Sequence, residues 1–168
     1  MKKILYSIFI AVILTSMVMS TALAGTTLSF KIIAGQTQLA GIVDITPEDN
    51  GDLTLNFRLL KNWCMTDAAI HTGLSVDDFP QNNGGAIPGQ FDTKIKFGGC
   101  VNTFGPVTID PEGFKEDVYI AIHLNVFDRY GVQETAWVVT CGDIEGGQFP
   151  GSNWSAWLLF PAQAWVVP

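Results

Sequence analysis

The chain has 168 residues with nine basic and sixteen acidic side chains, a formal net charge of −7 and three cysteines. An acidic surface repels phosphate backbones, which argues against nucleic acid as a partner. The sequence has neither the C-x-x-C spacing of a zinc knuckle nor the H-E-x-x-H motif of a zinc protease.

The first residues have the pattern of a secretory signal peptide. Lys2-Lys3 is followed by an apolar run over residues 4–18 and then by the small-x-small motif Ala22-Leu23-Ala24. This order predicts a signal peptide over residues 1–24. The alternative is an uncleaved anchor, because the segment is close to the roughly 20 residues that a membrane-spanning helix needs. We expect cleavage and a single secreted domain over residues 25–168, at the cell surface or in the medium.

Cleavage would leave seven basic against sixteen acidic residues, a net charge of −9. No later apolar run reaches membrane length, so we expect no membrane insertion of the mature domain.

The mature chain is dominated by alternation of apolar and polar residues, which predicts half-buried strands. Two such runs, 39–45 and 53–59, flank Asn50-Gly51, a strong hairpin signal. In chain order, the predicted strands cover residues 27–33, 39–45, 53–59, 66–73, 107–109, 118–127, 134–140, 154–160 and 164–167.

No window longer than eight residues shows a helical stripe, and residues 77–90 are rich in Gly, Pro and Asn. We expect a long loop there without regular structure, of the kind that often carries function. Many short strands at this spacing predict an all-β fold, a two-sheet antiparallel β-sandwich of immunoglobulin-like or jelly-roll-like type.

Several motifs, in this order and spacing, resemble a widespread family of secreted modules that often occur as repeats in larger surface proteins. The motifs are Ala34-Gly35-Gln36, Gly41-Ile42-Val43, Tyr119-Ile120-Ala121-Ile122-His123, Glu134-Thr135-Ala136-Trp137 and Asn153-Trp154-Ser155-Ala156. The resemblance implies an extracellular β-sandwich and supplies no catalytic residues. The chain departs from the pattern at Ala69, where the family commonly has His, and in its three cysteines.

Cys64, Cys100 and Cys141 allow one disulfide with three possible pairings in an exported protein. The remaining thiol would be buried and inert or would cross-link subunits.

Two sets of residues are candidates for a site. Asp128 and Glu134 could bind calcium through their carboxylates, and we expect no other cofactor. The structural alternative for Glu134 is a pair with Arg129 or with backbone donors. His123 is interpreted as a hydrogen-bonded structural histidine, or as a metal or acid–base residue paired with Glu134 or His71.

The second set would bind a ligand. It consists of the loop residues Asp77, Asp78, Asn82 and Asn83 and of two tryptophans, Trp157 and Trp165, whose exposed rings could stack on a sugar. By contrast, we expect Trp63, Trp137 and Trp154 to pack in the core.

The function predicted from these features is a non-enzymatic binding, adhesion or matrix module whose partner is an extracellular glycan or protein. The alternative is a self-assembling subunit of a filament or sheath, whose first or last strand adds to a neighbouring copy. A hydrolase is disfavoured because no G-x-S-x-G motif occurs and because the paired carboxylates are adjacent in sequence.

Overall fold

The computed structural model of the protein describes residues 25–111 and 115–165; the predicted signal peptide, residues 1–24, lies outside them. The strands are β1 (Leu28–Ala34), β2 (Gln38–Pro47), β3 (Leu53–Leu59), β4 (Trp63–Gly73), β5 (Gln81–Asn82), β6 (Gly85–Ala86), β7 (Thr93–Val101), β8 (Thr103–Ile109), β9 (Val118–Asp128), β10 (Gln133–Val139), β11 (Gly146–Gln148) and β12 (Ala156–Phe160). Three short 3-10 helices, η1 (Val76–Asp78), η2 (Pro88–Gln90) and η3 (Ala162–Trp165), complete the described elements.

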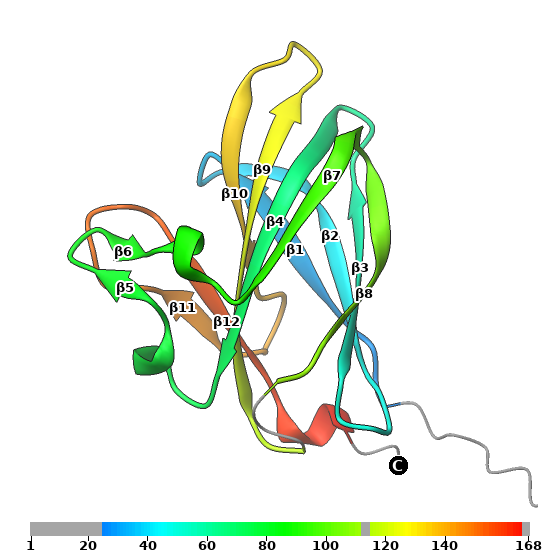
Figure 1. Ribbon diagram of the computed structural model, residues 1–168, viewed down its shortest axis with the longest axis vertical. Helices are drawn as coiled ribbons and strands as arrows, with labels where there is room; N and C mark the ends of the chain where they lie inside the picture. The colour runs from blue at the N-terminus through cyan, green and yellow to red at the C-terminus, as the bar shows by residue number, and fades with distance from the viewer. Residues whose placement is uncertain (1–24, 112–114, 166–168) are drawn as a thin grey trace, which may run out of the picture.

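Ten of the strands form one antiparallel sheet. Eight of them follow the order β11-β12-β9-β10-β1-β2-β3-β8, and two branch from this path, because β4 pairs with β9 and β7 pairs with β4. Since β7 and β8 follow each other in the chain, the sheet nearly closes on itself and becomes barrel-like. In Figure 1, β4, β7 and β9 lie in front of β1 and β2. The all-β prediction is confirmed. The division into two separate sheets is not, because backbone hydrogen bonds connect all ten strands.

Alternation determines which side chains face the interior of this sheet. In β3 the apolar residues Leu53, Leu55 and Phe57 are buried, whereas Thr54 and Asn56 between them are partly exposed. In β9 the side chains buried in the main core are Val118, Ile120, Ile122, Leu124 and Val126. Burying a side chain of this size stabilises the fold by about 1.5–3 kcal/mol.

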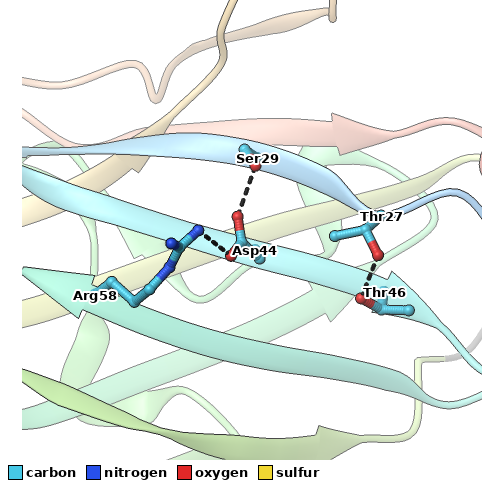
Figure 2. Close-up of polar contacts among 5 residues, drawn as sticks. All are labelled: Thr27, Ser29, Asp44, Thr46 and Arg58. Atoms are coloured by element: carbon cyan, nitrogen blue, oxygen red, sulfur yellow. Dashed lines mark hydrogen bonds and ion pairs between the residues drawn. The ribbon is translucent and has the colours of Figure 1, made fainter.

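The outer surface of β1, β2 and β3 is polar. Figure 2 shows Asp44 of β2 accepting a hydrogen bond from Ser29 of β1 at 2.6 Å and pairing with Arg58 of β3 at 2.5 Å. The hydroxyls of Thr27 and Thr46 lie 2.7 Å apart on the same face. The Arg58 side chain is 57% exposed, so this ion pair contributes at most about 1 kcal/mol.

The predicted hairpin between β2 and β3 is confirmed. Glu48 and Asp52 are joined by a backbone hydrogen bond of 2.8 Å, and Gly51 has a φ of 101°. The Asn50 side-chain oxygen accepts a hydrogen bond from the Asp52 N–H. Asn50-Gly51 therefore forms the turn because glycine adopts positive φ without steric cost.

The prediction that residues 77–90 lack regular structure is wrong. This segment holds the end of η1, the β5–β6 hairpin and η2. Strands of two residues are too short to show alternation in the sequence. Two further strands, β7 and β11, were not predicted, because Gly98-Gly99 interrupts the first and the second contains no large apolar residue.

The end of the described chain also differs from the prediction. The strand expected over residues 164–167 is replaced by η3 as far as Trp165, and its last two residues lie outside the described ranges. Across residues 25–111 and 115–165, the structure contains no helix with the length and apolar character needed to cross a bilayer.

Cys64 of β4 and Cys100 of β7 form a disulfide with a Cα–Cα distance of 5.2 Å. The predicted single disulfide is therefore confirmed, and the pairing of β4 with β7 selects its members. Cys141 is a free, half-buried thiol.

Candidate functional site

A second apolar cluster lies on the outer face of the sheet, over β4, β9, β10 and β12. It contains Ala69, Phe79, Phe91, Ala121, Trp137, Phe149 and Ala156, which we call the outer aromatic cluster. The Phe79 and Phe149 rings meet edge to face at a centroid distance of 5.2 Å, and Phe91 meets Trp137 at 6.2 Å. The long loop therefore packs on the outer face of the sheet through Phe79 and Phe91, and we call residues 77–91 the roof.

A pocket of about 590 Å³, which we call the main pocket, opens at the edge of this roof. Its lining combines the β1–β2 turn, the facing strands β9 and β10, the loop near η2 and the segment before β12. The residues are Gly35, Gln36, Ala86, Pro88, His123, Glu134, Thr135, Trp137, Ser152, Asn153, Trp154 and Ser155.

One wall of the main pocket is built by two segments far apart in the sequence. The N–H of Asn153 donates to the Gly84 carbonyl at 2.9 Å, and the N–H of Ala86 donates to the Ser155 hydroxyl at 3.2 Å. Gly151 has a φ of 145°, and a Cβ there would overlap the backbone of Gly85. Glycine at this position therefore allows the β5–β6 hairpin to join the segment before β12.

Glu134 lies at the opposite side of the pocket, next to the β1–β2 turn. A Cβ built on Gly35 would lie 3.2 Å from the Glu134 Oε2 atom, and Gly35 has a φ of 53°. Over the described part of the chain, the Glu134 carboxylate has no hydrogen-bond or ion-pair partner. Arg129, the partner considered from sequence, instead donates to the Tyr130 hydroxyl and stacks on its ring at 4.6 Å.

His123 is a half-buried residue in the floor of the site. It is the cross-strand neighbour of Trp137 on β10 and of Ala69 on β4. Burial lowers the pKa of the His123 imidazole below its ordinary value of 6.5, and the negative charge of Asp67 opposes this shift without cancelling it. The imidazole is therefore mostly neutral at pH 7 and can both donate and accept a hydrogen bond.

A second pocket of about 280 Å³, which we call the side pocket, adjoins the first and shares His123 and Pro88 with it. It lies over β4 and β7 and is also lined by Asp67, Ala68, Ala69, Gly89, Lys94, Ile95, Lys96 and Asn125. The Asn125 side chain donates to Asp67 at 2.7 Å.

The four loop residues predicted to bind a ligand lie at two different places in the loop. Asp78 caps η1 by accepting the backbone N–H groups of Leu74 and Ser75, at 3.0 and 2.8 Å, while Asp77 is exposed. Asn82 and Asn83 are exposed at the β5–β6 turn, where Asn82 accepts the Gly84 N–H. None of these four lines the main pocket.

The two tryptophans predicted to be exposed pack against other residues of the protein. Trp157 is half-buried and packs against Tyr119 at a centroid distance of 5.3 Å. Trp165 is only 7% exposed and its indole N–H donates to the Glu116 carbonyl, so the predicted exposure is wrong. The burial predicted for Trp63 and Trp137 is confirmed. Trp154 is half-buried and lines the main pocket, a role that the sequence did not suggest.

Of the two candidate calcium ligands, Asp128 ends β9 and Glu134 lies in β10, where it lines the main pocket. The Asp128 carboxylate accepts the N–H groups of Tyr130 and Val132 in the β9–β10 turn, at 2.8 and 2.9 Å. Within residues 25–111 and 115–165, no group of three or more His, Cys, Asp or Glu side chains is arranged to hold a metal ion.

His71 is separate from the main pocket as well. Its Nδ1 atom lies 2.7 Å from an Asp92 carboxylate oxygen, although the direction of approach is not that of a hydrogen bond. The His71 ring packs against Phe79 and Phe91 in the outer aromatic cluster. His71 therefore has a packing role and does not pair with His123.

The pocket is not apparent from the sequence, because its members lie on distant segments. The signal was nevertheless present, since Gly35-Gln36, His123, Glu134 to Trp137 and Asn153 to Ser155 all belong to the motifs singled out above. Their convergence on one pocket depends on the strand order.

A scan against protein-family models found no match, and searches of curated proteins and of solved structures returned no match either.

Proposed function

We propose that the protein is a non-enzymatic binding module that acts outside the cell, at a surface or in a matrix, and that its main pocket binds a saccharide. The observation that carries this proposal is the half-buried indole of Trp154 beside the exposed polar side chains of Asn153, Ser152 and Gln36. An indole can cover the apolar face of a pyranose ring, while amide and hydroxyl groups exchange hydrogen bonds with its hydroxyls.

The polar groups of the pocket suit a ligand rich in hydroxyls. Among the described residues that line the main pocket, Glu134 carries a carboxylate and His123 a mostly neutral imidazole. A carboxylate accepts hydrogen bonds from hydroxyls, and charge-assisted bonds of this kind are stronger than neutral ones. Glycoside hydrolysis commonly uses two carboxyl groups across the scissile bond. Within residues 25–111 and 115–165, the lining of the main pocket includes one carboxylate, that of Glu134, which supports binding without hydrolysis.

Two features support a location outside the cell. The Cys64–Cys100 disulfide is of a kind that persists in oxidising compartments. The first 24 residues have the pattern of a secretory signal peptide. We further propose that the protein is similar to the secreted modules named above and that its nearly closed sheet is a flattened β-sandwich.

Self-assembly by strand addition is the weaker alternative. The first strand, β1, is hydrogen-bonded to β10 on one side and to β2 on the other, so it has no free edge to offer. At the other end of the described chain, Trp165 is buried in a 3-10 helix. A concentration-dependent increase in size, measured by light scattering on the mature protein, would favour assembly through another edge.

The binding proposal is tested on an array of immobilised glycans with the mature protein and two matched variants. Trp154→Ala removes the indole from the main pocket, whereas Trp157→Ala removes a half-buried indole that lines neither pocket. We expect the wild type and Trp157→Ala to bind the same glycans, and Trp154→Ala to lose binding by on the order of tenfold or more. An array without a bound saccharide would contradict the proposal.

A further inference from the structure

The main and side pockets lie along two rows of side chains that cross four strands. In the first row, Lys94 of β7 is opposite Ala69 of β4, Ala69 is opposite His123 of β9, and His123 is opposite Trp137 of β10. In the second row, Lys96, Asp67, Asn125 and Thr135 are opposite one another in the same strand order. All eight residues therefore project from the same outer face of the sheet, because side chains alternate with a period of two.

The two pockets adjoin near the middle of the first row, where the side chain is small. Ala69 carries only a methyl group between the longer side chains of Lys94 and His123, and the side pocket lies over it. His123 and Pro88 line both pockets. Three inter-strand spacings separate β7 from β10, so the face that the two pockets share is about 14 Å across.

The floor of the side pocket is held in place before any ligand arrives. The Asn125 side chain donates to Asp67 Oδ1 at 2.7 Å, and Thr66 donates to Asp67 Oδ2 at 3.1 Å. The Lys94 ammonium donates to the Gly89 carbonyl at 2.6 Å and so connects β7 to the loop above. Polar groups with fixed orientations lose little conformational entropy on binding, which favours affinity.

From this arrangement we infer that the two pockets are subsites of one groove that binds a linear oligosaccharide across β7, β4, β9 and β10, with His123 beneath the point where the subsites meet. This inference rests on the proposed function and adds the length and direction of the ligand. A single pyranose unit would bind in the main pocket without reaching the side pocket. A chain of several units also reaches the hydrogen-bonding groups of Asp67, Asn125 and Lys94.

The groove is tested with oligomer series of glucose, N-acetylglucosamine and galacturonic acid, each of one, two, four and six units, titrated by calorimetry into the mature protein. We expect affinity in at least one series to rise on the order of tenfold or more from one unit to four units and then to level off.

Two glycine substitutions test the contribution of the side pocket to binding separately from that of the rest of the surface. Gly89 lines the side pocket and a Cβ there would meet no atom within 4 Å, so Gly89→Leu adds bulk to the pocket without strain in the fold. Gly99 is equally open but lines neither pocket, which makes Gly99→Leu the matched control. We expect Gly89→Leu to reduce binding of the four-unit chain to the level of the single unit, with no change for the single unit, and Gly99→Leu to leave both unchanged.

The outcomes separate the inference from the proposed function. Binding that is equal for one and four units, or insensitive to Gly89→Leu, overturns the groove and leaves the main pocket as a saccharide site. Absence of binding in all three series and on the glycan array overturns both.

Discussion

The rings of His123 and Trp137 meet edge to face, at a centroid distance of 5.1 Å and an interplanar angle of 69°, as cross-strand neighbours on β9 and β10. Ring pairs of this geometry contribute about 0.5–1.5 kcal/mol beyond their burial. Trp137 is 3% exposed, so its ring limits the access of water to one side of the imidazole. This contact links the protonation state of His123 to the packing of the site.

The lowered pKa of His123 predicts a loss of stability in acid. Its ordinary value, 6.5, applies to the unfolded chain, and burial lowers the folded value. Below pH 6.5 the unfolded state therefore binds the proton more readily than the folded state, and the free energy of unfolding falls until the pH passes the folded pKa. Urea unfolding of the wild type and of His123→Gln, at about pH 7.5 and about pH 5.5, measures this difference. We expect the wild type to lose more stability than the variant, and an equal loss in both would contradict the prediction.

The cap of η1 predicts different effects for two adjacent aspartates. Asp78→Ala removes the acceptor of two backbone N–H groups, at Leu74 and Ser75, so we expect a loss of about 1–2 kcal/mol in the free energy of unfolding. Asp77→Ala removes an exposed carboxylate, and we expect a change within about 0.5 kcal/mol. Equal effects of the two substitutions, measured by chemical denaturation, would show that Asp78 does not anchor the loop.

The disulfide between β4 and β7 predicts a large stabilisation. It closes a segment with a sequence separation of 36, for which restriction of the unfolded chain contributes about 4 kcal/mol. Cys64→Ser/Cys100→Ser should therefore lower the free energy of unfolding by about that amount. Cys141→Ser is the control and should have a small effect, because that thiol is free and half-buried.

Labelling of the unreduced native protein with an alkylating reagent, read by mass spectrometry, should modify no more than one thiol per chain, namely Cys141. Labelling at Cys64 or Cys100 would show that the pairing is different.

The contact of Gly151 with the β5–β6 hairpin predicts coupling between this backbone position and binding. A Cβ in Gly151→Ala would overlap Gly85, so the wall of the main pocket has to move. We expect reduced saccharide binding together with a loss of stability of more than about 1 kcal/mol. Gly142→Ala is the matched control, since Gly142 has a φ of 67° but open space around it. This control should show backbone strain alone, with binding unchanged. If Gly151→Ala bound as tightly as Gly142→Ala, the wall would not depend on this contact.

Trp165 is predicted to stabilise the fold and not to bind ligand. Trp165→Ala removes a ring that is buried in the main core and packs against Phe160 at a centroid distance of 5.8 Å. We expect a loss of about 3–5 kcal/mol, measured by thermal or urea unfolding. Glycan binding per folded molecule should stay unchanged, and a selective loss of binding would restore Trp165 as a ligand contact.

The elements predicted best from sequence are those whose signal is local. The alternating segments 53–59 and 118–127 form β3 and β9, and Asn50-Gly51 forms the hairpin turn. Alternation and turn preference act between residues close in the chain, so a single sequence contains the information needed to recognise them.

By itself, the sequence determined the strand-rich class, the hairpin between β2 and β3 and the acidic charge, and its three cysteines allowed one disulfide. Tertiary structure alone decided that Cys64 pairs with Cys100, that Trp165 is buried and that the loop after β4 forms a roof over the sheet. Only the strand order brings Gln36, His123, Glu134 and Asn153 to one pocket. The physical reason is that each of these outcomes depends on which strands become neighbours, and that choice is made by burial of the whole core.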